Sequence, residues 1–260
     1  STSERVRWDR PASSSGVETR ACTLPDQLRK RHACCTGEVI TLPLTTDRLT
    51  VRMMRAEHAA SLVEYRNHPD VARFQDWELP FTADMAERLI DGQAGLDGPA
   101  DDQWVQMAVE LEGVAIGDVA VGIHDKGRQA TIGYSITAAE QGKGYGSEAV
   151  TAVVAALFAE AHLHRITASA DPANEASRRL LEGLGFRFEG RSPLSVFVRG
   201  EWVDDDHFAL LATEYAEGLR RRTTKREVAR QLAANAAGLH WHSVGGDGRH
   251  LRPVGTRPAV

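Results

Sequence analysis

The sequence has no long apolar run and no apolar segment near its start. None of its runs approaches the roughly 18 consecutive apolar residues that a membrane-spanning helix needs. Residues 1–20 are polar and of mixed charge, so they lack the apolar core of a secretory signal peptide. We therefore expect a cytoplasmic protein with no membrane partner.

Cysteine is scarce and confined to the N-terminal stretch. The 260 residues include three cysteines, which are Cys22, Cys34 and Cys35. They lack the paired C-x-x-C spacing of a metal site and are too few for a disulfide framework. We interpret them as reduced thiols and expect no bound metal.

Two common phosphate-binding patterns are absent from the chain. The dinucleotide pattern G-x-G-x-x-G does not occur, and neither does the triphosphatase pattern G-x-x-x-x-G-K-[ST]. These absences exclude the dinucleotide-binding dehydrogenases and the nucleoside triphosphatases that carry such loops.

Charge is distributed unevenly along the chain. Residues 45–215 carry 15 basic and 28 acidic side chains, whereas residues 216–260 carry 9 basic and 3 acidic ones. An acidic body favours a cationic substrate over a nucleic acid, although an ordinary solvated surface has the same composition. The basic run 220–226 is either the solvated face of a helix expected over 217–237 or an anchor for an acidic partner or ribosomal RNA.

Hydrophobic periodicity predicts alternating strands and helices between the two ends. The period-two pattern of Leu49, Val51 and Met53 predicts a strand. Further strands are expected over 104–111, 115–123, 130–136, 165–170, 186–189, 195–198 and 208–212. Helices are expected over 59–65, 82–93, 150–161 and 174–184.

The predicted fold class is α+β, with a mixed central sheet of about seven strands flanked by helices. The first three long strands are joined by short turns, which predicts an antiparallel meander. The expected organisation is an N-terminal extension (1–40), one domain (41–215) and a basic C-terminal extension (216–260).

Residues 141–147 form a glycine-rich segment, Gln-Gly-Lys-Gly-Tyr-Gly-Ser, between a predicted strand and the most strongly predicted helix. The first N–H groups of a helix are unpaired and its N-terminal end is positive, so this junction can bind an anion. Glycines let a phosphate approach the backbone closely. Taken alone, such a segment is more often only a turn. Its spacing and its neighbouring elements therefore decide whether it is interpreted as an anion-binding loop.

The segment resembles the Q/R-x-x-G-x-G/A acyl-CoA signature of the GNAT superfamily, with Gln141, Gly144 and Gly146 at its defined positions. Other segments are similar to the RimJ/RimL-type branch, which acylates protein N-termini and some small amines. They are residues 164–166, 171–177, 180–186, 189–190 and 200–204. The resemblance covers residues 42–215 and implies a GNAT fold with acetyl-CoA as co-substrate.

The resemblance also implies how coenzyme A binds. Backbone N–H groups of the glycine segment would hold the pyrophosphate, and the pantetheine arm would pair with the strand near 135–137. A splay between that strand and strand 165–170 would admit the thioester. The implied binding residues are Ile136, Thr137, Gln141, Gly142, Gly144, Tyr145, Gly146, Ser147 and Asn174.

Two catalytic tasks are assigned by the same resemblance. Ser177 matches a position that protonates the departing thiolate, although Ser177 and Asn174 also fit the first turn and N-cap of a helix. The position of a base glutamate falls near Val196, which cannot accept a proton. Asp76 is our candidate base, and the alternatives Glu78 and Asp204 are equally typical of surface or turn residues.

We therefore expect an N-acetyltransferase that moves an acetyl group from acetyl-CoA to a primary amine, foremost a protein N-terminus. A small-molecule amine, such as an aminoglycoside or a polyamine, is an alternative acceptor. A non-catalytic acyl-CoA sensor is the alternative from another class. The loop does not determine the acyl group, and a homodimer formed through the extensions is left open.

Overall fold

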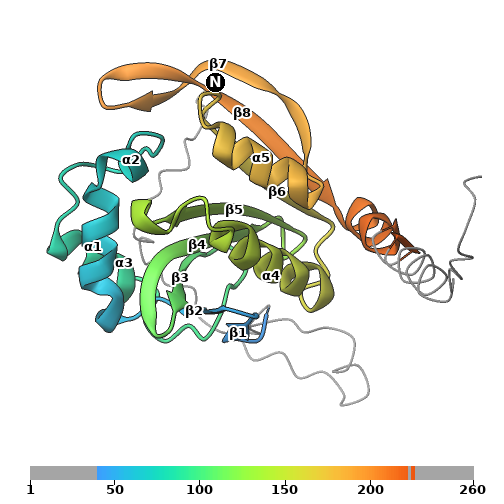
Figure 1. Ribbon diagram of the computed structural model, residues 1–260, viewed down its shortest axis with the longest axis horizontal. Coiled ribbons are helices and arrows are strands. Elements are labelled where there is room, and N and C mark those ends of the chain that lie inside the picture. The colour runs from blue at the N-terminus through green and yellow to red at the C-terminus, as the bar shows by residue number, and fades with distance from the viewer. Residues whose placement is uncertain (1–39, 222–223, 226–260) are drawn as a thin grey trace, which may run out of the picture. The chain divides into compact units, whose positions relative to one another are not determined.

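The computed structural model describes residues 40–221 and 224–225 (Figure 1). The chain divides into two compact units, residues 1–216 and 217–260. In the second unit, residues 217–221 and 224–225 are helical. The rest of the helix expected over 217–237, the three cysteines and residues 1–39 lie outside the described residues. No helix within the described ranges is long and apolar enough to cross a membrane.

Eight strands of the first unit form one mixed sheet in the order β1-β2-β3-β4-β5-β6-β8-β7. They are β1 (Leu44–Thr45), β2 (Leu49–Met53), β3 (Trp104–Leu111), β4 (Val114–His124), β5 (Gln129–Ile136), β6 (Arg165–Ala170), β7 (Arg187–Val198) and β8 (Glu201–Leu211). Only β5 and β6 run parallel, and the other neighbours are antiparallel. The predicted mixed sheet and meander are confirmed.

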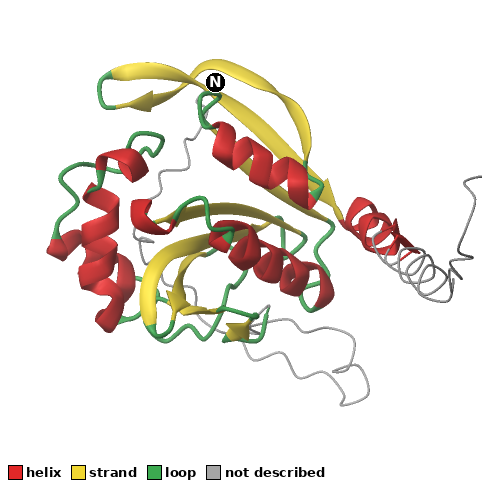
Figure 2. Ribbon diagram, in the orientation of Figure 1, coloured by secondary structure: helices red, strands yellow, loops and turns green. Residues whose placement is uncertain are grey.

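Helices pack on both faces of this sheet (Figure 2). They are η1 (Ala56–His58), α1 (Ala59–Asn67), α2 (Pro69–Ala72), α3 (Ala83–Asp91), η2 (Ala138–Glu140), α4 (Tyr145–Ala159) and α5 (Glu175–Leu184). Alternate residues of β3 point to opposite faces of the sheet and so belong to two different cores. Met107 and Val109 belong to the core that includes α4 and α5, whereas Ala108 packs with α1 and α3.

The signals at helix ends act as the sequence predicts. Thr82 caps α3, because its hydroxyl accepts a hydrogen bond from the Met85 N–H at 3.3 Å. Gly185 ends α5 with φ +100°. In α4, Val150, Val153 and Leu157 are fully buried against the sheet, as their spacing predicts.

The late strands differ from the prediction. The predicted strands 186–189 and 195–198 are parts of one long strand, β7, and 208–212 is the end of the long strand β8. The prediction of three short strands was therefore wrong in their division and length, since β7 and β8 form one hairpin. The pairing register of β7 shifts between Phe188 and Gly190 and again between Ser192 and Val196. Such bulges interrupt side-chain alternation, so the middle of β7 resembles a loop in sequence.

The parallel pairing of β5 with β6 is short. It joins residues 129–131 to residues 165–167 and goes no further, although β5 continues to Ile136 and β6 to Ala170. The two strands therefore separate, and the predicted splay between them is confirmed. The gap lies at the same ends of the strands as the glycine segment.

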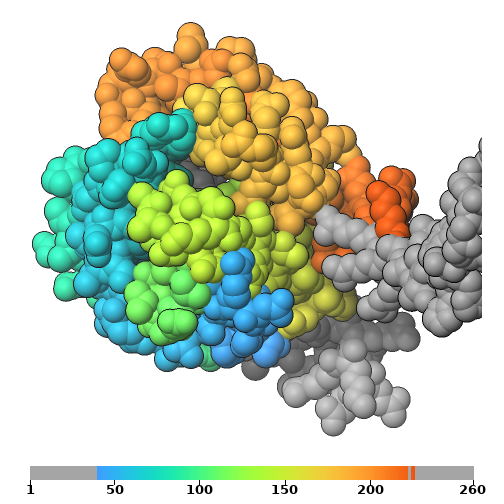
Figure 3. Space-filling model, in the orientation of Figure 1, coloured from blue at the N-terminus to red at the C-terminus, as the bar shows by residue number. Residues whose placement is uncertain are grey.

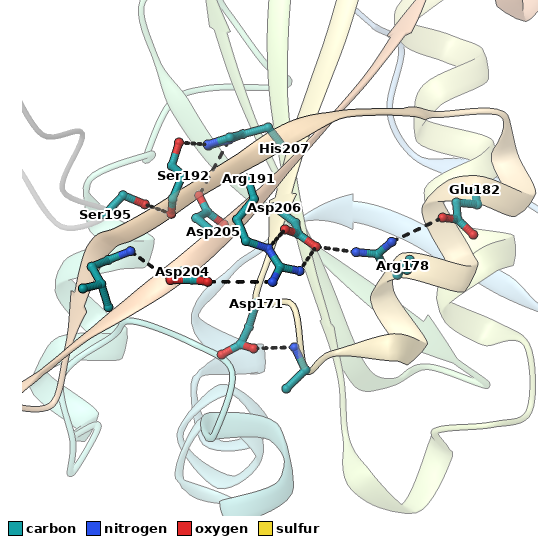
Figure 4. Close-up of polar contacts among 12 residues, drawn as sticks. Asp171, Arg178, Glu182, Arg191, Ser192, Ser195, Asp204, Asp205, Asp206 and His207 are labelled. Atoms are coloured by element: carbon teal, nitrogen blue, oxygen red, sulfur yellow. Dashed lines mark hydrogen bonds and ion pairs between the residues drawn. The ribbon is translucent and has the colours of Figure 1, made fainter.

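A buried carboxylate joins α5 to the β7–β8 hairpin (Figure 4). Asp206 on β8 is 1% exposed and accepts hydrogen bonds from Arg191 at 2.6 and 3.1 Å. It also accepts one from Arg178 on α5. These hydrogen bonds, chiefly those from Arg191, lower the pKa of Asp206.

We expect Asp206→Asn to lower the free energy of unfolding by about 2 kcal/mol at neutral pH, because charged hydrogen bonds to two arginines are weakened. Since the folded-state pKa is depressed, this stabilisation is present above pH ~4 and is lost as the pH falls through the folded pKa. Urea unfolding at several pH values measures both effects. Asp205→Asn is the matched control, since burial raises the pKa of Asp205. Equal losses of unfolding free energy in Asp206→Asn and Asp205→Asn would contradict the stabilising role assigned to the arginine contacts of Asp206.

Candidate active site

The glycine segment forms a tight loop that ends in the first turn of α4. Gly142 has φ +75° and Gly144 has φ +86°, a region that residues with a side chain rarely adopt. Gly144 is the N-cap of α4. The backbone N–H groups of the following residues therefore lie at a helix N-terminus, where they have no partner within the helix.

Side chains hold this loop from two sides. Gln141 donates through Nε2 to the Ile136 carbonyl at 2.9 Å, which ties the loop to the end of β5. Arg48 donates to the Lys143 carbonyl at 3.2 Å and to Glu148 at 2.7 Å. Arg48 was not predicted from the sequence, because nothing local marks a residue almost 100 positions upstream.

An open cleft of about 790 Å³ runs past the loop. Its walls come from α2, the end of β5, the loop, the start of α4, and α5 (Figure 3). Eight of the nine expected coenzyme A residues line it: Ile136, Gln141, Gly142, Gly144, Tyr145, Gly146, Ser147 and Asn174. Thr137 is not among the lining residues, and its N–H donates to the Ile116 carbonyl at 2.8 Å.

A smaller inner cavity of about 120 Å³ adjoins the cleft. It lies where β5 and β6 separate, between β4 and the loop after α2. Six residues line both spaces: Phe74, Gln75, Tyr134, Ser135, Asn174 and Ser177. A molecule extended along the cleft can thus present one end to the inner cavity at this junction.

Two hydroxyl groups meet at the junction. The Tyr134 hydroxyl lies 2.8 Å from Ser177 Oγ. Burial raises the pKa of Tyr134 to about 12, so the phenol keeps its proton at neutral pH. Asn174 caps α5 by accepting from the Ser177 N–H at 3.1 Å, so the alternative role noted for Asn174 is present in the structure. Tyr134 was missed, since a tyrosine in a strand is usually a packing residue.

A buried carboxylate lines the inner cavity. Asp118 on β4 is 3% exposed, and its Oδ2 lies 3.5 Å from Arg66 Nη2. Burial raises the pKa of Asp118, and the neighbouring Arg66 charge opposes that effect. Asp118 was also missed, although a single carboxylate in the apolar run 115–123 is the signal that marks it.

Asp76, the base expected from sequence, also lines the inner cavity but is exposed. Glu78 and Asp204 do not line either space, and neither does Val196. Asp204 instead accepts a hydrogen bond from the Leu194 N–H at 2.9 Å within the hairpin. Of the carboxylates proposed from sequence, Asp76 alone reaches the cavity wall.

The turn of the β7–β8 hairpin holds the loop that carries Asp76. Arg199 in that turn donates to the carbonyls of Ala72 and Gln75 at 2.6 and 2.9 Å. These two bonds join residues more than 120 positions apart. The wall formed by Phe74 and Gln75 is therefore held by the hairpin as well as by its own neighbours.

In the part of the chain that the structure describes, no group of three or more His, Cys, Asp or Glu side chains could hold a metal ion. The lining of the two spaces offers backbone N–H groups, hydroxyls and carboxylates. Its cleft, glycine loop and helix N-terminus fit an extended phosphate-bearing molecule.

Comparison with known proteins agrees with this geometry. The family model described as "Acetyltransferase (GNAT) domain" matches residues 48–187. The chain belongs to the GNAT acetyltransferase family. Members of this family are acyl-CoA-dependent N-acetyltransferases, and so is this protein.

Its relatives include proteins with a named acceptor. An uncharacterised N-acetyltransferase, p20 of Bacillus licheniformis, is 33% identical over 66% of this chain and 98% of its own length. The ribosomal protein uS5-alanine N-acetyltransferase of Escherichia coli is 29% identical over 67% of this chain and 93% of its length. The structure of Mycobacterium smegmatis RimJ with CoA-disulfide has a TM-score of 0.57 and 25% identity, over 67% of this chain and 86% of that one.

Proposed function

We propose that this GNAT acetyltransferase acetylates the α-amino group of a protein N-terminus. The observation that carries the proposal is the junction of a long cleft, which runs past the glycine loop, with a small cavity that carries carboxylates. The E. coli relative, named as an N-acetyltransferase for an alanine of ribosomal protein uS5, supports a protein acceptor. Acetyl-CoA supplies the activated acetyl group.

The glycine loop and the gap beside β5 would bind the donor. We assign the pyrophosphate to the backbone N–H groups of Gly142, Gly144, Tyr145, Gly146 and Ser147, because these residues line the cleft at the start of α4. The edge of β5 that β6 leaves unpaired, up to Ile136, offers backbone partners to the pantetheine arm. Asn174 lines the same path. We exclude Thr137 from this proposal because its N–H is already used.

The residues of the junction would handle the protons. The amine nitrogen bonds to the acetyl carbon, and the carbon–sulfur bond breaks with its electron pair left on sulfur. Of the two protons that an ammonium acceptor loses, one goes to a carboxylate and then to solvent. Sulfur takes a proton from Ser177, and Tyr134 returns a proton to Ser177. The second amine proton restores Tyr134, so the products are the amide, the free thiol of coenzyme A and one proton in solvent. The carboxylate is Asp118 or Asp76.

Thiol-release assays with acetyl-CoA and three acceptor classes test this function. The acceptors are peptides with free N-termini, polyamines and aminoglycosides, and mass spectrometry locates the acetyl group. We expect turnover with the peptides and acetylation of the α-amine. Faster turnover with a polyamine or an aminoglycoside than with every peptide would overturn the proposed acceptor.

A further inference from the structure

The inner cavity contains an unusual concentration of unpaired polar atoms. Across residues 40–221 and 224–225, four buried side-chain atoms have no hydrogen-bond partner: Tyr65 Oη, Arg66 Nε, Gln106 Oε1 and Asp118 Oδ1. Arg66, Gln106 and Asp118 line the cavity, whereas Tyr65 does not line it and lies within hydrogen-bonding reach of Asp118 and Arg66. Buried polar groups are nearly always paired in folded proteins, so three side chains with unpaired polar atoms around one cavity indicate a site for a polar group.

The orphans include both acceptors and a donor. Asp118 Oδ1 and Gln106 Oε1 can only accept hydrogen bonds, whereas Arg66 Nε can only donate one. Arg66 cannot turn freely, because its guanidinium lies 4.6 Å from the Trp77 ring centre and 4.7 Å from that of Phe81. A matching ligand therefore needs a donor group and an acceptor group close together.

The size of the cavity limits the ligand further. Its volume of about 120 Å³ is a small fraction of the 790 Å³ of the donor cleft. That space admits the end of a molecule and excludes a large one. The opening toward the donor cleft lies at Tyr134, Ser135 and Ser177, so the inserted end faces the place where the thioester would lie.

We propose that Arg66, Gln106 and Asp118 bind the terminal aminoacyl group of the acceptor, with its amine on Asp118 and Gln106 and its first carbonyl oxygen on Arg66 Nε. An α-amine and the adjacent carbonyl are the donor and acceptor that the cavity requires. A polyamine has the donor alone and would leave the Arg66 donor unpaired. This assignment rests on the proposed function and specifies how that function selects its substrate.

The rates with two small amines distinguish the proposed carbonyl contact from the proposed amine contact. Alaninamide has an α-amine beside a carbonyl, and sec-butylamine is a carbonyl-free amine of the same branching. With rates expressed per neutral amine, we expect wild-type protein to favour alaninamide in kcat/KM by roughly 30-fold, since a charged hydrogen bond is made with one substrate only.

Arg66→Lys keeps the positive charge beside Asp118 but removes the guanidinium Nε. We expect it to reduce the preference for alaninamide to within about 3-fold, mainly by slowing alaninamide. Gln106→Met should slow both amines by a similar factor of about 10, because it removes a contact to the amine that they share. Arg88→Lys, on the exposed face of α3, is the matched control and should change neither rate.

The outcomes distinguish this inference from the proposed function. A 30-fold preference that persists in Arg66→Lys, or a Gln106→Met protein with wild-type rates, would overturn the aminoacyl site alone. Should Arg66→Lys fail to fold, the rates of Gln106→Met with the two amines still test the aminoacyl site. No turnover of alaninamide or of any peptide by the wild-type protein would overturn both.

Discussion

Gly144→Asp should weaken coenzyme A binding on the order of 100-fold. The new carboxylate would lie at the N-cap of α4, beside the N–H groups that we assign to the pyrophosphate, and would repel it. A side chain at φ +86° is strained as well. Titration calorimetry with coenzyme A measures the dissociation constant directly, without any acceptor.

Gly127→Asp is the matched control for this variant. Gly127 also has a positive φ, +73°, and a Cβ there would meet nothing within 4 Å. It lies in the turn between β4 and β5 and lines neither the cleft nor the inner cavity. The control should bind coenzyme A like the wild type. If Gly144→Asp did so too, the anion site would have to be elsewhere.

Asp118→Asn should lower kcat/KM for a peptide acceptor by roughly 100-fold to 1,000-fold, which lies within the range of about 100-fold to 10,000-fold for general acid–base contributions. An amide keeps the shape of the carboxylate but cannot take the proton of the amine. Arg66 and Tyr65 face Asp118 from α1, and Asp76 and Asp171 share its cavity. Circular dichroism and thermal unfolding would show that the variant is folded.

The pH dependence gives a second measurement of the same group. Burial raises the pKa of Asp118, so its carboxylate becomes protonated, and inactive as a base, at a higher pH than an ordinary aspartate. Wild-type kcat/KM should fall as the pH drops through that pKa, and Asp118→Asn should lose this acidic limb. Asp76 lines the same cavity but is exposed, so Asp76→Asn is the control. It should lower kcat/KM by less than about 5-fold. The reverse order of effects would make Asp76 the base.

Much of the donor side of the site could be predicted from sequence, because its signals are local. The spacing of Gln141, Gly144 and Gly146 depends on backbone conformation within a few residues, and the apolar face of α4 has a clear helical period. Both follow from steric rules that act along the chain. The match to the GNAT domain agrees with the fold that the resemblance of the glycine segment implies.

The acceptor side could not be predicted in the same way. Asp118 meets Arg66 only because β4 passes beneath α1, and a single carboxylate in a strand does not reveal which helix covers it. The role proposed for Tyr134 depends on its contact with the hydroxyl of Ser177, which lies 43 residues further along the chain. The bulges of β7 likewise depend on pairing with β8, so periodicity alone divided one strand into two.

The short pairing of β5 with β6 makes the sheet two halves joined by a three-residue seam. The pantetheine arm of acyl-CoA, bound in the gap, would pair with the free edge of β5 as an additional strand that can dissociate. Folding and co-substrate level then become thermodynamically linked, because a ligand at 100 times its dissociation constant stabilises the folded state by about 2.7 kcal/mol. Under this linkage, the resistance of the protein to unfolding and proteolysis would rise and fall with the supply of acyl-CoA around it.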